Sequence, residues 1–174
     1  MSKSLGNVID PFDLIKRYGA EPVRYFLLRE ISATEDGDLT EEKVKERYNG
    51  DLANGLGNLL SRVLTVGEKY GREVPLKTED LAEETKKVWE SYEKSLDEYQ
   101  FHEALATVWK LVTGADVYVN KKEPWKLLKG HDHDFSESLG DELGHTISSL
   151  VLVLANIGWM LKPFLPETAD KIID

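Results

Sequence analysis

Residues 40–71 read TEEKVKERYNGDLANGLGNLLSRVLTVGEKYG, and this stretch determines the fold that we expect. Its apolar residues recur at steps of three and four, which is the spacing of one helix face. They are Val44, Tyr48, Leu52, Leu56, Leu59, Leu60, Val63 and Leu64. Thr40 is suited to cap a helix N-terminus and Gly71 to end a helix. The pattern predicts one long helix between them.

Three glycines lie inside this expected helix, at Gly50, Gly55 and Gly57. Each costs about 1 kcal/mol in a helix relative to alanine. We expect them to be present because a neighbouring backbone packs closely against them.

The rest of the chain also carries helical patterns. Asp10, Pro11 and Gly19 have the residue types that begin and end a short helix, and a second short helix should follow. Longer helices are expected at about 80–99, at about 101–120 and from 136 onward, with a last one beginning near residue 167. Pro124 should stop any further helix after the fifth. No strand pattern stands out, so we expect an all-α chain.

The expected architecture is a helical bundle of about five main helices, preceded by a short N-terminal loop and a helical lead-in. We divide the chain into a loop and lead-in at 1–38 and a bundle at 39–174. We also expect the native protein to continue past residue 174.

Composition narrows the class of protein. Hydrophobic residues make up 41% of the 174 residues, which is typical of a folded domain, and cysteine is absent. No stretch approaches the roughly 20 apolar residues of a membrane span, and no signal peptide is recognisable. We expect a cytoplasmic protein without a membrane partner. The net charge of −10 argues against nucleic acid. However, residues 110–129 carry five lysines against two acidic residues, a locally basic region.

The N-terminal residues 1–11 read MSKSLGNVIDP. The ammonium of Lys3 and the hydroxyls of Ser2 and Ser4 could surround phosphates and stabilise the charge on a departing pyrophosphate. The run resembles the KMSKS signature of class I aminoacyl-tRNA synthetases, without its first lysine. The resemblance implies that these three residues act on ATP phosphates.

Two later segments are similar to methionyl-tRNA synthetases in particular: RYNGDLANGLGNLLSRV at 47–63 and NKKEPW at 120–125. The resemblance covers the whole chain. It implies the C-terminal part of such an enzyme, from the signature loop through the anticodon-binding domain. The parent enzyme would use ATP, with Mg²⁺, to join methionine to its tRNA. Its catalytic domain would lie upstream in the same polypeptide, so this part alone should catalyse nothing and bind no cofactor.

The same resemblance assigns anticodon recognition to Asn58, Arg62 and Trp125. Unpaired bases can stack on an aromatic ring and be read along their polar edges. The expectation is that the three side chains converge on one partly exposed surface, with phosphate contacts from nearby lysines: Lys121, Lys122 and Lys126. The structural alternatives are a core tryptophan at a helix stop and an Asn–Arg pair that merely faces water.

Other interpretations remain open at this point. The chain could belong to a leucyl, valyl or isoleucyl enzyme, or could be a stand-alone acidic helical module that binds basic partners. The sequence HDHD at 131–134 fits a solvated acidic loop better than a metal site, and we expect no metal site. Trp89, Trp109 and Trp159 occupy helical positions where we expect core residues.

Overall fold

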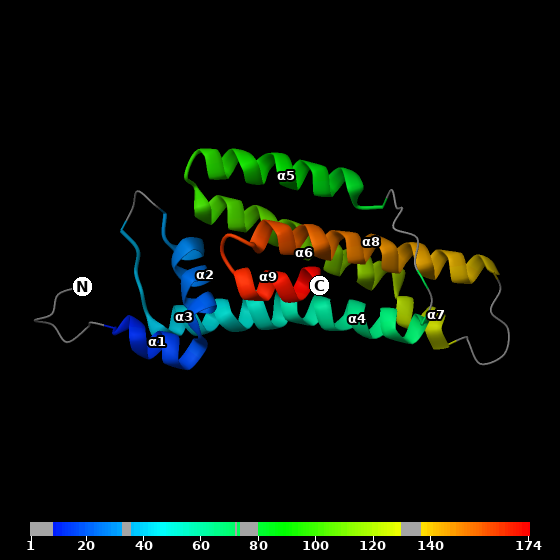
Figure 1. The fold of residues 1–174 in the computed structure, drawn as a ribbon, viewed down its shortest axis with the longest axis horizontal. Coiled ribbons are helices and arrows are strands. Elements are labelled where there is room, and N and C mark those ends of the chain that lie inside the picture. The colour runs from blue at the N-terminus through cyan, green and yellow to red at the C-terminus, as the bar shows by residue number, and fades with distance from the viewer. Residues whose placement is uncertain (1–8, 33–35, 72, 74–79, 130–136) are drawn as a thin grey trace, which may run out of the picture.

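The structure is a computed structural model of the chain, and it describes residues 9–32, 36–71, 73, 80–129 and 137–174. Within these ranges every regular element is a helix, which confirms the all-α prediction (Figure 1). The elements are α1 (Pro11–Tyr18), α2 (Ala20–Glu30), α3 (Glu41–Arg47), the π-helix η2 (Tyr48–Gly57), α4 (Asn58–Tyr70), α5 (Ala82–Asp97), α6 (Phe101–Lys122), α7 (Pro124–Lys129), α8 (Glu137–Leu161) and α9 (Pro166–Ile173).

The lead-in is formed by α1 and α2. The Asp10 carboxylate accepts a hydrogen bond from the Phe12 amide at 2.9 Å, and Gly19 ends α1 at a φ of 90°, as the sequence predicted. A small core joins α1 and α2 to α3 through Leu14, Val23, Phe26 and Val44. Tyr25 of α2 instead belongs to the main core of the bundle. The boundary after residue 38 therefore stays a prediction.

Helical backbone continues from α3 through η2 into α4, so the long helix is present but its central ten residues are wound more widely. The Thr40 hydroxyl accepts from the Lys43 amide at 3.3 Å, and Gly71 ends α4 with a φ of 61°. The predicted reason for the glycines is wrong. A Cβ at Gly55 or Gly57 would lie 3.2 or 3.1 Å from a carbonyl oxygen five residues earlier in the same segment. The wide π turn, rather than a neighbouring backbone, produces this crowding.

The bundle places α4 and α6 side by side in the same direction (Figure 1). Gly55 of η2 lies against Trp109, and Arg62 of α4 reaches Asp116 further along α6. The intervening α5 packs on α6 in the opposite direction, since Glu84 lies against Gly114. Fully buried side chains from α6 and α8 fill the centre: Leu105, Leu111, Leu150, Ile157, Met160 and Leu161.

The segment after α6 corrects a second prediction, because Pro124 begins a helix instead of preventing one. Glu123 takes a left-handed conformation with a φ of 43° and ends α6. Pro124 then occupies the first position of α7, where its missing N–H costs no hydrogen bond. The change of chain direction at Glu123 brings α7 against α4, so that Trp125 of α7 lies beside Arg62 of α4.

The helix α8 is the most apolar in the described part of the chain. Residues Gly140–Leu161 have the length and mean hydropathy, 1.4, of a membrane span, but 67% of that window is buried inside the bundle. This burial identifies α8 as a core helix of the bundle. Trp159 on α8 is 56% exposed, so the expectation of a core tryptophan is wrong there. Trp89 and Trp109 do pack against the core, partly buried.

Candidate functional site

Two of the three predicted recognition residues are in direct contact. The guanidinium carbon of Arg62 lies 4.9 Å from the centre of the Trp125 ring, within the range of a cation–π interaction. Trp125 is partly buried against the core and keeps some exposed surface. The ring therefore lies beside Arg62, and the role of both residues in anticodon binding stays a prediction.

Two residues to which the sequence interpretation gave no role hold the Arg62 guanidinium. Its Nη1 donates to Asp116 Oδ1 at 2.6 Å, and its Nη2 donates to Asn120 Oδ1 at 2.6 Å. Asn120 in turn donates from Nδ2 to Asp116 Oδ2 at 3.0 Å. The arginine head group is thus fixed by a carboxylate, an amide and an aromatic ring.

Asn58 is exposed and lies one helical turn before Arg62, so both residues share a face of α4. They line a depression of about 550 Å³ between η2, α4 and α6. Its other lining residues are Gly50, Asp51, Asn54, Gly55, Ser61, Trp109, Val112, Thr113 and Asp116. Trp125 is not part of this lining and adjoins the depression through Arg62.

One wall of the depression is fixed by a polar network from the lead-in. The Tyr25 hydroxyl donates to Asp51 at 2.6 Å, and Arg47 lies 3.3 Å from the same carboxylate oxygen. Burial and the bond to Asp51 raise the pKa of Tyr25 far above its usual range, so Tyr25 remains a donor. The Tyr25 ring also packs on Trp109, with ring centres 4.9 Å apart. Helix α2 therefore supports two residues of the depression.

The Trp109 indole nitrogen, which lies beside this depression, is buried and has no hydrogen-bond acceptor among the described residues. Such a donor is costly to leave unpaired. Nothing in the sequence distinguished Trp109 from other core aromatics. Its place beside the depression arises only because α6 packs on η2.

The three predicted phosphate-contact lysines differ in their surroundings. Lys126 Nζ lies 2.8 Å from Glu123. Lys122 Nζ lies 3.9 Å from Glu142 and 4.0 Å from Asp80. Lys121 is exposed beside a second groove. Their contacts with phosphate stay predictions.

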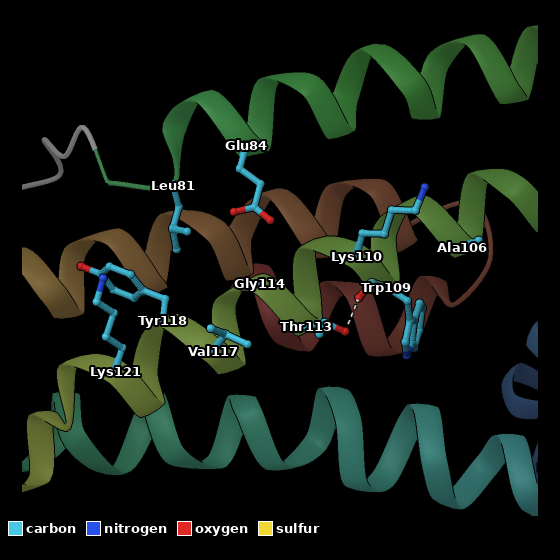
Figure 2. Close-up of a pocket in the computed structure, with 10 residues that line it drawn as sticks. All are labelled: Leu81, Glu84, Ala106, Trp109, Lys110, Thr113, Gly114, Val117, Tyr118 and Lys121. Atoms are coloured by element: carbon cyan, nitrogen blue, oxygen red, sulfur yellow. Dashed lines mark hydrogen bonds between the residues drawn. The ribbon is translucent and has the colours of Figure 1, made fainter.

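The second groove, of about 720 Å³, lies between α5 and α6 (Figure 2). Lys110 and Lys121 stand on α6 at its two sides, and the Glu84 carboxylate projects from α5 toward Gly114 between them. The groove is therefore mixed in charge. Trp109 and Thr113 line both this groove and the first depression.

Ser2, Lys3 and Ser4 lie outside the described residues, as does the sequence HDHD at 131–134. Their roles stay predictions. Across the described ranges, no group of three or more His, Asp or Glu side chains is arranged to hold a metal ion.

Comparisons with known proteins identify the family. Residues 1–64 match the family described as tRNA synthetases class I (M). The whole chain is 41% identical to a methionine–tRNA ligase of Caldanaerobacter subterraneus subsp. tengcongensis and 40% identical to that of Bacillus subtilis, covering 27% and 26% of those proteins. The chain belongs to the methionyl-tRNA synthetase family.

The fold agrees with that family. A crystal structure of Mycobacterium tuberculosis methionyl-tRNA synthetase bound by methionyl-adenylate superposes with a TM-score of 0.89 at 33% identity. The match covers 99% of this chain and 35% of the mycobacterial one. The chain thus spans about a quarter to a third of the length of its methionyl-tRNA synthetase relatives.

Proposed function

We propose that this chain is the C-terminal, anticodon-binding part of a methionine–tRNA ligase. The parent enzyme activates methionine with ATP, in the presence of Mg²⁺, and transfers it to its tRNA in the cytoplasm. Ser2, Lys3 and Ser4 contact the ATP phosphates during activation. The catalytic domain lies upstream in the same polypeptide, so the chain alone is inactive and binds tRNA without ATP.

The contact between Arg62 and Trp125, beside the depression that Asn58 lines, is the observation that supports this proposal. An aromatic ring, a planar set of donors and an amide are the groups that read unpaired bases. Trp125 and Arg62 come from helices distant in sequence and are in contact, and Asn58 lines the depression beside Arg62. A tryptophan and an arginine with only a packing role would not need an exposed asparagine and an open depression next to them.

The charge of the chain indicates how such a surface would work. A net charge of −10 gives little general attraction for a tRNA backbone. Base contacts must therefore supply much of the binding free energy, and phosphate contacts must be local. The basic region that contains Lys121, Lys122 and Lys126 is next to Trp125 in sequence, which fits this division.

The test compares two RNA stem–loops, one with the methionine anticodon CAU and one with those three bases replaced. Trp125→Ala should weaken binding of the CAU stem–loop by about 1–3 kcal/mol, because it removes a stacking surface. It should have little effect on the other RNA. Dissociation constants are measured by fluorescence anisotropy at one fixed salt concentration.

Trp159→Ala is the matched control, because it removes another partly exposed tryptophan, which is 56% exposed on α8 and does not line the depression beside Arg62. It should change neither affinity. Equal weakening of both RNAs by Trp125→Ala, or no weakening of either, would reject anticodon recognition at this surface.

A further inference from the structure

We infer that Asp116 and Asn120 are positioning residues, which hold Arg62 in the orientation that reads an unpaired base. This inference rests on the proposed function. The two side chains accept from different terminal nitrogens of Arg62, both at 2.6 Å. They lie four residues apart on α6 and hence on the same helix face.

The arrangement is closed rather than a simple ion pair. The second carboxylate oxygen of Asp116 accepts from the Asn120 amide at 3.0 Å, which turns the amide oxygen of Asn120 toward Arg62. Each of the three side chains is therefore oriented by the other two. Trp125 lies over the guanidinium and limits its movement in the remaining direction.

The clamp formed by Asp116 and Asn120 leaves Arg62 able to bind a ligand. A guanidinium carries five N–H donors, and the clamp uses two of them, so three remain for acceptors on a base edge. A free arginine side chain would lose about 2 kcal/mol of rotamer freedom when it orders on a ligand. With the clamp, this rotamer freedom is already lost when the chain folds, so its loss does not weaken RNA binding.

Asp116 also has an effect that does not depend on base identity. Its side chain is 45% exposed, so its negative charge opposes every RNA backbone that approaches. Removing it should weaken base reading and, at the same time, reduce repulsion for all RNAs. The informative quantity is therefore the ratio of affinities for the CAU stem–loop and the stem–loop with a replaced anticodon.

The experiment measures this ratio for the chain and for Asp116→Ala, Asn120→Ala and Arg62→Ala. Each of the first two should lower the ratio about tenfold, the effect of losing roughly 1.4 kcal/mol of discrimination. Asp116→Asn keeps an oxygen acceptor and should recover most of the ratio. Combining Asp116→Ala with Arg62→Ala should lower the ratio no further than Arg62→Ala alone, because Asp116 acts through Arg62.

Glu41→Ala is the matched control. The Glu41 side chain is 44% exposed and forms an ion pair with Arg17 on the lead-in, so this change removes the same charge and a similar bridge elsewhere. It should leave the ratio unchanged. Thermal unfolding followed by circular dichroism identifies any variant that is not folded, and Asn120→Ala then decides in place of Asp116→Ala.

Each outcome discriminates. If Arg62→Ala lowers the ratio but Asp116→Ala and Asn120→Ala do not, the positioning role is wrong and the proposed function stands. If Arg62→Ala and Trp125→Ala both leave the ratio unchanged, the proposed function fails and the positioning role fails with it. If Glu41→Ala lowers the ratio as much as Asp116→Ala, the loss of discrimination does not depend on contact with Arg62 and the clamp is rejected.

Discussion

At the scale of single residues, the ion pair between Arg62 and Asp116 contributes more to orientation than to stability. Both side chains are about a third to a half exposed, and ion pairs of this kind contribute about 0–1 kcal/mol to folding. A change at Asp116 should therefore lower the discrimination between the two RNAs while changing the melting temperature little. This separation is what makes the site testable by substitution.

Lys121 should behave differently from the base-reading residues. We expect Lys121→Ala to weaken both stem–loops equally, because phosphate contacts carry no sequence information. The slope of log affinity against log salt concentration should fall in magnitude by about 1. Affinities measured at four salt concentrations test this.

Lys45→Ala, an exposed lysine on α3, is the control for Lys121 and should change the slope little. A loss confined to the CAU stem–loop would mean that Lys121 reads a base. An unchanged slope would remove Lys121 from the RNA path.

Sequence reasoning reached Asn58, Arg62 and Trp125 because each lies in a short recognisable segment. It gave no role to Asp116, or to Asn120 although that residue begins the segment NKKEPW; the two lie 54 and 58 positions from Arg62. Nothing local in the sequence marks either as an arginine partner. Only the parallel packing of α4 and α6 brings them together, and that packing depends on α5 returning the chain to the same end of the bundle.

At the scale of elements, helix positions were predictable because they follow from local rules. Asp10, Thr40, Gly19 and Gly71 begin or end helices where their types predicted. The π-helix η2 was not predictable from apolar spacing, since its buried Leu56 also fits an ordinary helix. Pro124 was misjudged because a proline that stops one helix is also suited to begin the next.

The crossing of α8 and α9 gives a prediction about packing. A Cβ at Gly158 would lie 2.8 Å from Ile173 Cγ1 and 3.2 Å from Ile172 Cγ2. Gly158→Ala should therefore push α9 away and reduce the free energy of unfolding by about 1–3 kcal/mol, a typical cost of overpacking. Urea denaturation measures this change.

Gly67→Ala is the control, since a Cβ there would make only an ordinary contact of 3.9 Å with Ile147. It should leave stability unchanged or raise it by up to about 1 kcal/mol, through the better helix propensity of alanine. If Gly158→Ala is as well tolerated as Gly67→Ala, the close approach of α9 is wrong.

At the scale of the whole molecule, the two ends of the described chain are joined. The Glu21 carboxylate of α2 accepts hydrogen bonds from the Glu167 and Thr168 amides at 2.6 and 3.1 Å, and from the Thr168 hydroxyl at 2.6 Å. A side chain of the lead-in thus caps the first turn of α9, where the helix dipole favours negative charge. The lead-in and the bundle should unfold together.

Alkaline pH should destabilise this single unit through its buried tyrosines. Burial raises the pKa of Tyr92 to about 12, and its hydroxyl donates to the Met160 carbonyl at 2.7 Å. In the unfolded chain the pKa is about 10. Below pH 10 both states keep the proton, so stability is unaffected. Between pH 10 and 12 only the unfolded state loses it, and the unfolding free energy should fall by about 2–3 kcal/mol.

Unfolding free energies measured in urea between pH 8 and 12 test this expectation. Tyr92→Phe should lower stability at pH 8, because the Met160 carbonyl loses its donor, but should make the alkaline decline less steep. Tyr99→Phe, at a position 72% exposed, should change neither quantity. Burial also raises the pKa values of Tyr25 and Tyr118, so Tyr92→Phe should remove only part of the decline. An equally steep decline in Tyr92→Phe would show that Tyr92 does not contribute to it.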